Sequence, residues 1–210
     1  TTDVAGLTTT QVAGLTSAQI GSLTTTQIGA VETTDLAALT TAQVKGFTTT
    51  QIGALTTTQL ASVTPTQLGA LTTTQVGGIT TTQVAALNTT QVGGLTSALL
   101  GALNTTQVGA LETTDIAVLT ATQVKGLSTT QLNFLTTTQL ASVTTTQVAA
   151  LTNTQVSGLN TTQIGALSAG QLGALTSAQL AALTTTQLGQ FSTTDVAGLT
   201  TTQVAGLTSA

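Results

Sequence analysis

The chain has 210 residues, two Lys against six Asp or Glu, and no His, Cys, Met, Trp or Tyr. This composition removes nucleophile–base pairs, soft metal ligands and aromatic binding residues, so we expect no enzyme activity, cofactor or metal site. The net charge of −4 offers no basic surface to phosphates, and nucleic acid is not an expected partner. No apolar run approaches the length of about 18 residues that a membrane-spanning helix needs, so no transmembrane segment is expected.

An eight-residue repeat, here called the octad, runs through the sequence: TTTQVAGL at 8–15 is followed by TSAQIGSL at 16–23. We number its positions 1 to 8, with position 1 at residues 8, 16, 24 and every eighth residue after them. Positions 5 and 8 are Val, Ile, Leu or Phe in every octad, and these residues are predicted to form the core. The examples in the first two octads are Val12, Leu15, Ile20 and Leu23.

Each octad carries the pattern of a helix start. Position 1 is nearly always Thr, Ser or Asn, and position 4 is Gln in 21 of 26 octads, which together match a capping box flanked by a hydrophobic staple. We therefore predict one short helix per octad over positions 2 to 7, with positions 8 and 1 extended. Positions 5 and 8 are then i, i+3 neighbours that face one core. The predicted fold is an all-α solenoid of short capped helices.

A β-solenoid with coils of 16 or 24 residues is the alternative fold. Thr and Val are frequent, and both favour strands. Positions 5 and 8 differ in parity, however, so a straight strand would send them to opposite faces of a sheet. The alternative therefore requires a corner inside every octad.

Charged residues interrupt the pattern in two related octads, ETTDLAAL at 32–39 and ETTDIAVL at 112–119. The acids could bind a cation, but Asp in the first turn of a helix also interacts favourably with the helix dipole, and we interpret them as capping variants. Lys45 and Lys125 follow at position 6 and are interpreted as solvated surface charge. The alternative is pairing with acidic groups on an adjacent turn or chain, which makes both residues candidate lateral contacts. The acidic residues are Asp3, Glu32, Asp35, Glu112, Asp115 and Asp195.

The only proline lies in VTPTQLGAL at residues 63–71. The capping pattern makes Thr64 the N-cap, Pro65 the first helical residue and Gln67 the third. Proline is favoured at that first helical position, because its missing N–H has no partner there in any case. The proline therefore indicates where every other octad begins its helix.

Further departures follow along the chain. Leu99 replaces Gln at position 4 and is predicted to weaken one helix start slightly, whereas Phe47 and Phe191 at position 8 are predicted core residues. Phe134 occupies a position that is mostly held by small residues and is a candidate lateral contact. Asn-Thr-Thr triplets are predicted to supply helix N-caps, with N-glycosylation as the alternative, at Asn88, Asn104 and Asn160.

Residues 1–18 are identical to residues 193–210, a shift of 192 residues or 24 octads. We predict that residues 1–210 form a single continuous octapeptide-repeat solenoid. We also expect the chain to be a window of a longer array with a 192-residue higher-order repeat.

The recurring phrase L-T-x-x-Q-V resembles Thr/Gln-rich octapeptide tracts of very large secreted, adhesion-like bacterial surface proteins. This resemblance implies an extracellular or cell-surface location. We therefore predict a structural protein that forms an extracellular rod, fibre or filament by stacking and lateral association of octads, with other copies of itself as partners. The alternatives are an adhesin stalk and a surface module that binds ice or polysaccharide through regular Thr arrays.

Overall fold

The computed structural model describes residues 6–207, and in this range the chain forms 25 short α-helices, one per octad, and no strand. The predicted all-α solenoid of capped helices is confirmed, and the β-solenoid alternative is wrong. The chain forms two compact units, residues 1–111 and residues 112–210, and each is described by itself.

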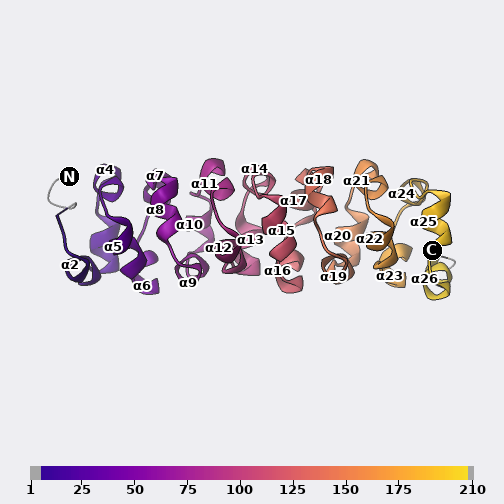
Figure 1. Cartoon of the computed structure of the whole chain (residues 1–210), viewed down its shortest axis with the longest axis horizontal. Helices are drawn as coiled ribbons and strands as arrows, with labels where there is room; N and C mark the ends of the chain where they lie inside the picture. The colour runs from indigo at the N-terminus through magenta and orange to yellow at the C-terminus, as the bar shows by residue number, and fades with distance from the viewer. Residues whose placement is uncertain (1–5, 208–210) are drawn as a thin grey trace. The chain divides into compact units, whose positions relative to one another are not determined.

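The first unit contains thirteen helices of four to six residues (Figure 1). They are α2 (Thr9–Ala13), α3 (Ser17–Gly21), α4 (Thr25–Gly29), α5 (Thr33–Ala38), α6 (Thr41–Val44), α7 (Thr49–Ala54), α8 (Thr57–Ser62), α9 (Pro65–Gly69), α10 (Thr73–Val76), α11 (Thr81–Ala85), α12 (Thr89–Gly93), α13 (Ser97–Ala102) and α14 (Thr105–Gly109).

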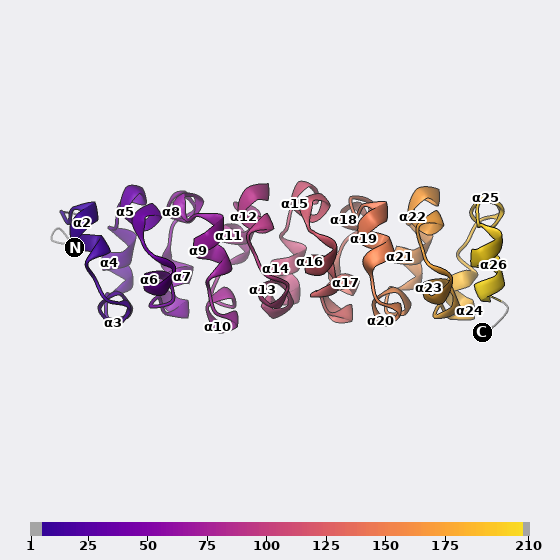
Figure 2. The ribbon, with the colours of Figure 1, turned by 90° about the horizontal axis from the view of Figure 1, so that it is seen from below.

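The second unit contains twelve helices of the same kind (Figure 2). They are α15 (Thr113–Val118), α16 (Ala121–Lys125), α17 (Thr129–Phe134), α18 (Thr137–Ala141), α19 (Thr145–Ala150), α20 (Asn153–Ser157), α21 (Thr161–Gly165), α22 (Ala169–Gly173), α23 (Ser177–Ala181), α24 (Thr185–Leu188), α25 (Thr193–Ala197) and α26 (Thr201–Leu207). The longest described helix, α26, has seven residues, and no helix between residues 6 and 207 is long and apolar enough to cross a membrane.

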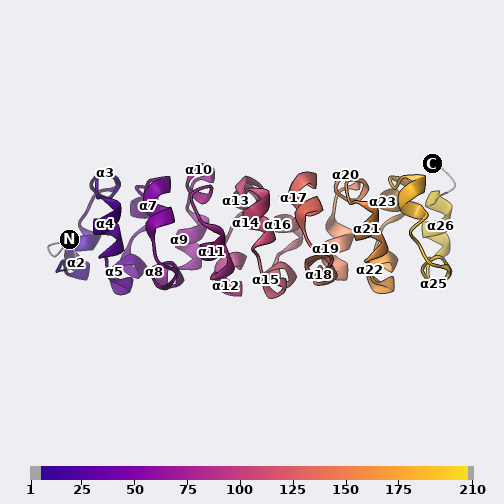
Figure 3. The same ribbon diagram turned by 90° about the horizontal axis from the view of Figure 1, so that it is seen from above.

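Three octads make one coil of the solenoid in each unit. In the first unit α5 packs on α2 and α8, α6 packs on α3 and α9, and α7 packs on α4 and α10. In the second unit α18 packs on α15 and α21 in the same way, which can be followed in Figure 3. Each helix therefore lies beside the helix 24 residues before it. The 24-residue coil considered for the β-solenoid has the right length, but helices rather than strands form its sides.

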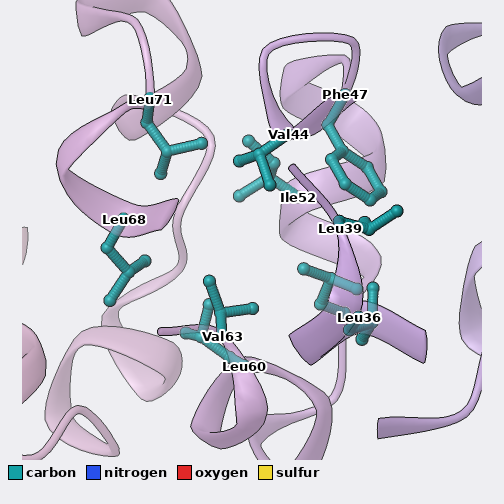
Figure 4. Close-up of a pocket in the computed structure, with 10 residues that line it drawn as sticks. Leu36, Leu39, Val44, Phe47, Ile52, Leu60, Val63, Leu68 and Leu71 are labelled. Carbon is teal, nitrogen blue, oxygen red and sulfur yellow. The ribbon is translucent and has the colours of Figure 1, made fainter. Parts of the chain in front are cut away.

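The positions 5 and 8 side chains fill the inside of each coil. Leu36 and Leu39 are 1% and 6% exposed, and they converge with Val44, Phe47 and neighbouring residues of the first unit on an entirely apolar interior (Figure 4). A helix of five residues cannot be stable alone, because nucleating the helix costs more free energy than the hydrogen bonds of a single turn contribute. The short helices therefore depend on burial against the preceding and following coils.

Glycines at positions 6 and 7 allow the coils to approach closely. A Cβ on Gly94 would lie 2.6 Å from the carbonyl oxygen of Pro65, three octads earlier, and a Cβ on Gly78 would lie 2.8 Å from the Cα of Thr49. No residue in the described range has a positive φ, so these glycines do not serve left-handed turns. Their role is to let backbone contact backbone between coils.

Candidate functional site: a glutamine ladder between coils

Most described helix starts are capping boxes, and Gln67 shows the geometry. Thr64 has extended backbone angles (φ −71°, ψ 156°), and its Oγ1 accepts a hydrogen bond of 3.2 Å from the backbone N–H of Gln67. The Oε1 of Gln67 accepts in turn from the backbone N–H of Thr64 at 2.7 Å. Pro65 is the first residue of α9, between the two. Two backbone donors that a helix start leaves without partners are thus satisfied locally.

The amide nitrogen of the same side chain connects two coils. The Nε2 of Gln67 donates to the backbone carbonyl of Leu36 at 2.9 Å and to that of Leu39 at 2.6 Å, residues that lie 31 and 28 positions earlier. A third contact, to the carbonyl of Ala37, is longer at 3.3 Å. These carbonyls lie at the C-terminal end of α5, where the last carbonyls of a helix have no N–H four residues later in the same helix to accept from. One carboxamide therefore caps the start of its own helix and the end of the helix four octads before it.

The same contact recurs throughout both units and forms what we call the glutamine ladder. Each member donates from Nε2 to carbonyls of the octad four before it, and all are at most 6% exposed. The members in the first unit are Gln43, Gln51, Gln59, Gln67, Gln75, Gln83, Gln91 and Gln107. Those in the second unit are Gln147, Gln155, Gln163, Gln171, Gln179, Gln187 and Gln203.

Glutamine is the side chain that suits this position. It is neutral, long enough to reach the neighbouring coil, and carries both an acceptor and two donor hydrogens. Glutamate could complete the capping box but would place a buried negative charge against carbonyl oxygens. Burying a polar group is tolerated only when it is hydrogen-bonded, and the ladder satisfies both ends of the amide.

Five octads depart from the ladder by sequence. Leu99 is 2% exposed and keeps only half of the capping box, in which its N–H donates to Thr96 Oγ1 at 3.2 Å. Its side chain can donate nothing to the carbonyls of Leu68 and Leu71, four octads earlier. The predicted weakening at Leu99 therefore extends beyond the helix start to the contact between coils. The remaining departures are Asp3, Asp35, Asp115 and Asp195, of which Asp3 lies outside the described residues.

The aspartates can accept hydrogen bonds but, when ionised, cannot donate them. Asp35 accepts from the hydroxyl of Thr9 at 2.7 Å, and Asp195 accepts from the hydroxyl of Ser192 at 2.7 Å. The Ser192 bonds lower the pKa of Asp195, whereas burial is the main cause that raises the pKa of Asp115. Between residues 6 and 207 no group of three acidic, His or Cys side chains could hold a metal ion.

Core and surface residues singled out by the sequence lie in distinct places. Val12 and Ile20 are buried, and Leu15 and Leu23 are half-buried in the first described coil. Phe134 is 59% exposed, and Lys45 and Lys125 are exposed as well, so all three candidate lateral contacts lie on the surface. The asparagines of the Asn-Thr-Thr triplets are helix N-caps whose Oδ1 atoms accept from the Gln three residues later: Asn88, Asn104 and Asn160.

The interaction that the sequence analysis missed is the donation from Nε2 to the neighbouring coil. A signal for it exists, because position 4 never contains Glu although Glu also completes a capping box. That preference indicates a use for the amide hydrogens.

These features define the class of the protein: an α-solenoid repeat protein with one capped helix per octad. The sequence matches the ALTTAQ repeat family over residues 1–33, 28–65, 65–97, 79–113, 108–145, 144–177 and 174–209, so the chain belongs to that family. A search of curated proteins finds no match. The family match shows a tandem-repeat protein, in agreement with the repeat recognised in the sequence.

Proposed function

We propose that the chain is a structural protein that builds an extracellular rod or fibre from stacked octads and acts without catalysis. The observation that carries the proposal is the glutamine ladder, which joins each coil to its neighbours through the same buried hydrogen bonds in both units. Most of the described octads contribute a glutamine to these hydrogen bonds between coils. The chain also lacks the His, Cys and Tyr side chains that most catalytic sites use.

Lateral association of copies is part of this proposal. Eight charged residues in 210 give little electrostatic repulsion between copies, and Phe134 is an exposed aromatic at a position elsewhere occupied mostly by small residues. Lys45 and Lys125 would pair with acidic residues of a neighbouring copy. The resemblance to secreted bacterial surface proteins supports the extracellular location.

Negative-stain electron microscopy of the purified chain tests the proposal. We expect elongated particles that lengthen or bundle as protein concentration rises. Phe134→Ser should thin the bundles without shortening them, and Phe134→Leu is the matched control. Compact, monodisperse globules at every concentration would contradict a fibre-forming role.

The alternative of an ice- or polysaccharide-binding surface depended on Thr side chains spaced as on strands. Thr at positions 1 to 3 instead forms the N-cap and first turn of each helix, as at Thr72, Thr73 and Thr74. The condition for that alternative is therefore not met, and the structural role is the function that we propose.

A further inference from the structure

Three Asn-Thr-Thr triplets share almost the same local sequence but differ in what surrounds their side chains. Residues 86–93 and 102–109 both read ALNTTQVG, and residues 158–165 read GLNTTQIG. Asn-x-Thr is the acceptor sequence for the transfer of a sugar to an asparagine side chain. Any difference between the three asparagines as acceptors must therefore come from the fold. All three are exposed helix N-caps: Asn88, Asn104 and Asn160.

Capping uses only the oxygen of each of these side chains. The Oδ1 of Asn88 accepts from the backbone N–H of Gln91 at 2.9 Å. Asn104 accepts from the backbone N–H of Gln107 in the same way, also at 2.9 Å. Within residues 6–207 the Nδ2 atoms of Asn88 and Asn104 donate no hydrogen bond. A sugar bonded to Nδ2 would leave Oδ1 in place as an acceptor, because the product is still an amide. Helix capping and N-glycosylation are therefore compatible on one side chain.

The third asparagine differs because its nitrogen has a partner in an earlier coil. The Nδ2 of Asn160 donates to the Oδ1 of Asn133 at 3.2 Å. Asn133 is itself held in place, because its Nδ2 donates to the backbone carbonyl of Gly158. The nitrogen that would accept a sugar at Asn160 is thus engaged, and the Asn133 side chain lies beside it.

The residue type at one other position accounts for this difference. Asn133 lies at position 6, 27 residues before Asn160. The residues 27 positions before the other two asparagines are Ala61 and Gly77, and neither offers a side-chain hydrogen-bond acceptor. The Thr that completes each triplet is exposed in all three cases: Thr90, Thr106 and Thr162. The amide nitrogens of Asn88 and Asn104 are therefore accessible together with the rest of the acceptor sequence.

We propose that Asn88 and Asn104 are N-glycosylation sites on the folded chain, and that the bond to Asn133 slows the same reaction at Asn160. The partner is a glycosyltransferase that acts on side-chain amides, and the donor is a sugar joined through its C1 to a diphosphate. The Nδ2–C1 bond forms as the C1–O bond breaks. The diphosphate leaves with the electron pair, and one Nδ2 proton passes to a base of the transferase. The inference goes beyond the structural function and does not depend on it.

Site-resolved glycosylation of the folded chain tests the proposal. One arm uses a soluble N-glycosyltransferase with a nucleoside diphosphate sugar, and the other a membrane oligosaccharyltransferase with a polyprenyl diphosphate sugar. Each enzyme is first shown to modify synthetic peptides 86–93 and 158–165, which are unfolded, at equal rates. Mass spectrometry of proteolytic fragments should then show Asn88 and Asn104 of the folded chain reacting about fivefold faster than Asn160, the factor that one hydrogen bond contributes. The arm that reacts identifies the donor, and no reaction of the folded chain in either arm would overturn the proposal.

Substitutions at exposed positions exchange the two environments without disturbing the core. Asn133→Ala removes the acceptor and should raise the rate at Asn160 about fivefold, whereas Asn153→Ala, at another exposed asparagine of the same unit, should leave it unchanged. Ala61→Asn supplies an acceptor and should lower the rate at Asn88 about fivefold. The circular dichroism spectrum should be the same before and after glycosylation, because Oδ1 continues to cap the helix. Equal rates at the three asparagines of the folded wild-type chain, or a rate at Asn160 that Asn133→Ala does not change, would overturn the inference and leave the structural proposal standing.

Discussion

The Nε2 of Gln67 donates a 2.6 Å hydrogen bond to the backbone carbonyl of Leu39, 28 residues earlier in the chain. Through the same side chain, Thr64 closes its capping box. A local motif that starts one helix is thereby coupled to the end of another helix in a different coil. This coupling lets helices of four to seven residues persist, since backbone groups at a helix end are satisfied by a side chain of another coil as well as within their own octad.

Restoring the missing member of the ladder should stabilise the chain. Leu99→Gln supplies an acceptor for the N–H of Thr96 and donors for the carbonyls of Leu68 and Leu71, at the loss of one buried leucine side chain. We expect a net gain of about 1 kcal/mol in the free energy of unfolding, measured by urea titration followed at 222 nm.

The neighbouring residue provides the control for that change. Leu100 is 0% exposed at position 5, which faces the apolar interior rather than the carbonyls of the glutamine ladder. Leu100→Gln should therefore destabilise the chain by about 3 kcal/mol. Equal losses from both substitutions would show that residue 99 behaves as ordinary core.

Two adjacent glycines test the close approach of coils. A Cβ on Gly94 would meet the backbone of Pro65 at 2.6 Å, and a Cβ on Gly93 would meet nothing within 4 Å. Gly94→Ala should therefore lower the free energy of unfolding by about 1–2 kcal/mol, while Gly93→Ala should raise it by up to about 1 kcal/mol through helix propensity. Thermal unfolding of both variants measures the difference, and stabilisation by both would contradict the inferred backbone contact.

Asp115 should make stability depend on pH in a defined direction. Burial raises the pKa of its carboxyl above the ordinary value of 3.8, and the charge of Glu112 acts in the same direction. The folded chain therefore holds the proton more tightly than the unfolded chain. This contribution is fully present below pH 3.8 and is lost as pH rises through the folded-state pKa.

Asp115→Asn should accordingly stabilise the chain at pH 7, with the advantage shrinking as the pH falls toward 3.8. Asp195 is the matched control, because hydrogen bonds from Ser192 lower the pKa of its carboxyl. Its contribution is present above 3.8 and is lost as pH falls through the folded-state pKa, so Asp195→Asn should show the opposite trend. Melting temperatures measured between pH 3 and pH 8 check both signs.

The sequence predicts what is local. Thr64, Pro65 and Gln67 lie within four residues, and their spacing alone assigns the N-cap, the first helical residue and the third. Positions 5 and 8 likewise identify the buried side of each helix, because both lie within one octad. The hydrogen bonds from the Gln67 side chain to the carbonyls of Leu36 and Leu39 cannot be predicted from this local spacing, because an amide donor could equally bond to water. The octad sequence also does not predict how many helices complete one coil, because that number depends on the angle between successive helices.

The comparison of Gln67→Glu with Gln11→Glu tests the central claim most directly. Glutamate keeps the acceptor of the capping box in both octads, but at residue 67 it removes the donors to Leu36 and Leu39 and buries a charge. We predict a loss of about 3 kcal/mol in the free energy of urea unfolding for Gln67→Glu at pH 7, and a change within about 0.5 kcal/mol for the exposed Gln11→Glu. Equal small changes at both positions would contradict the glutamine ladder as the element that holds the coils together.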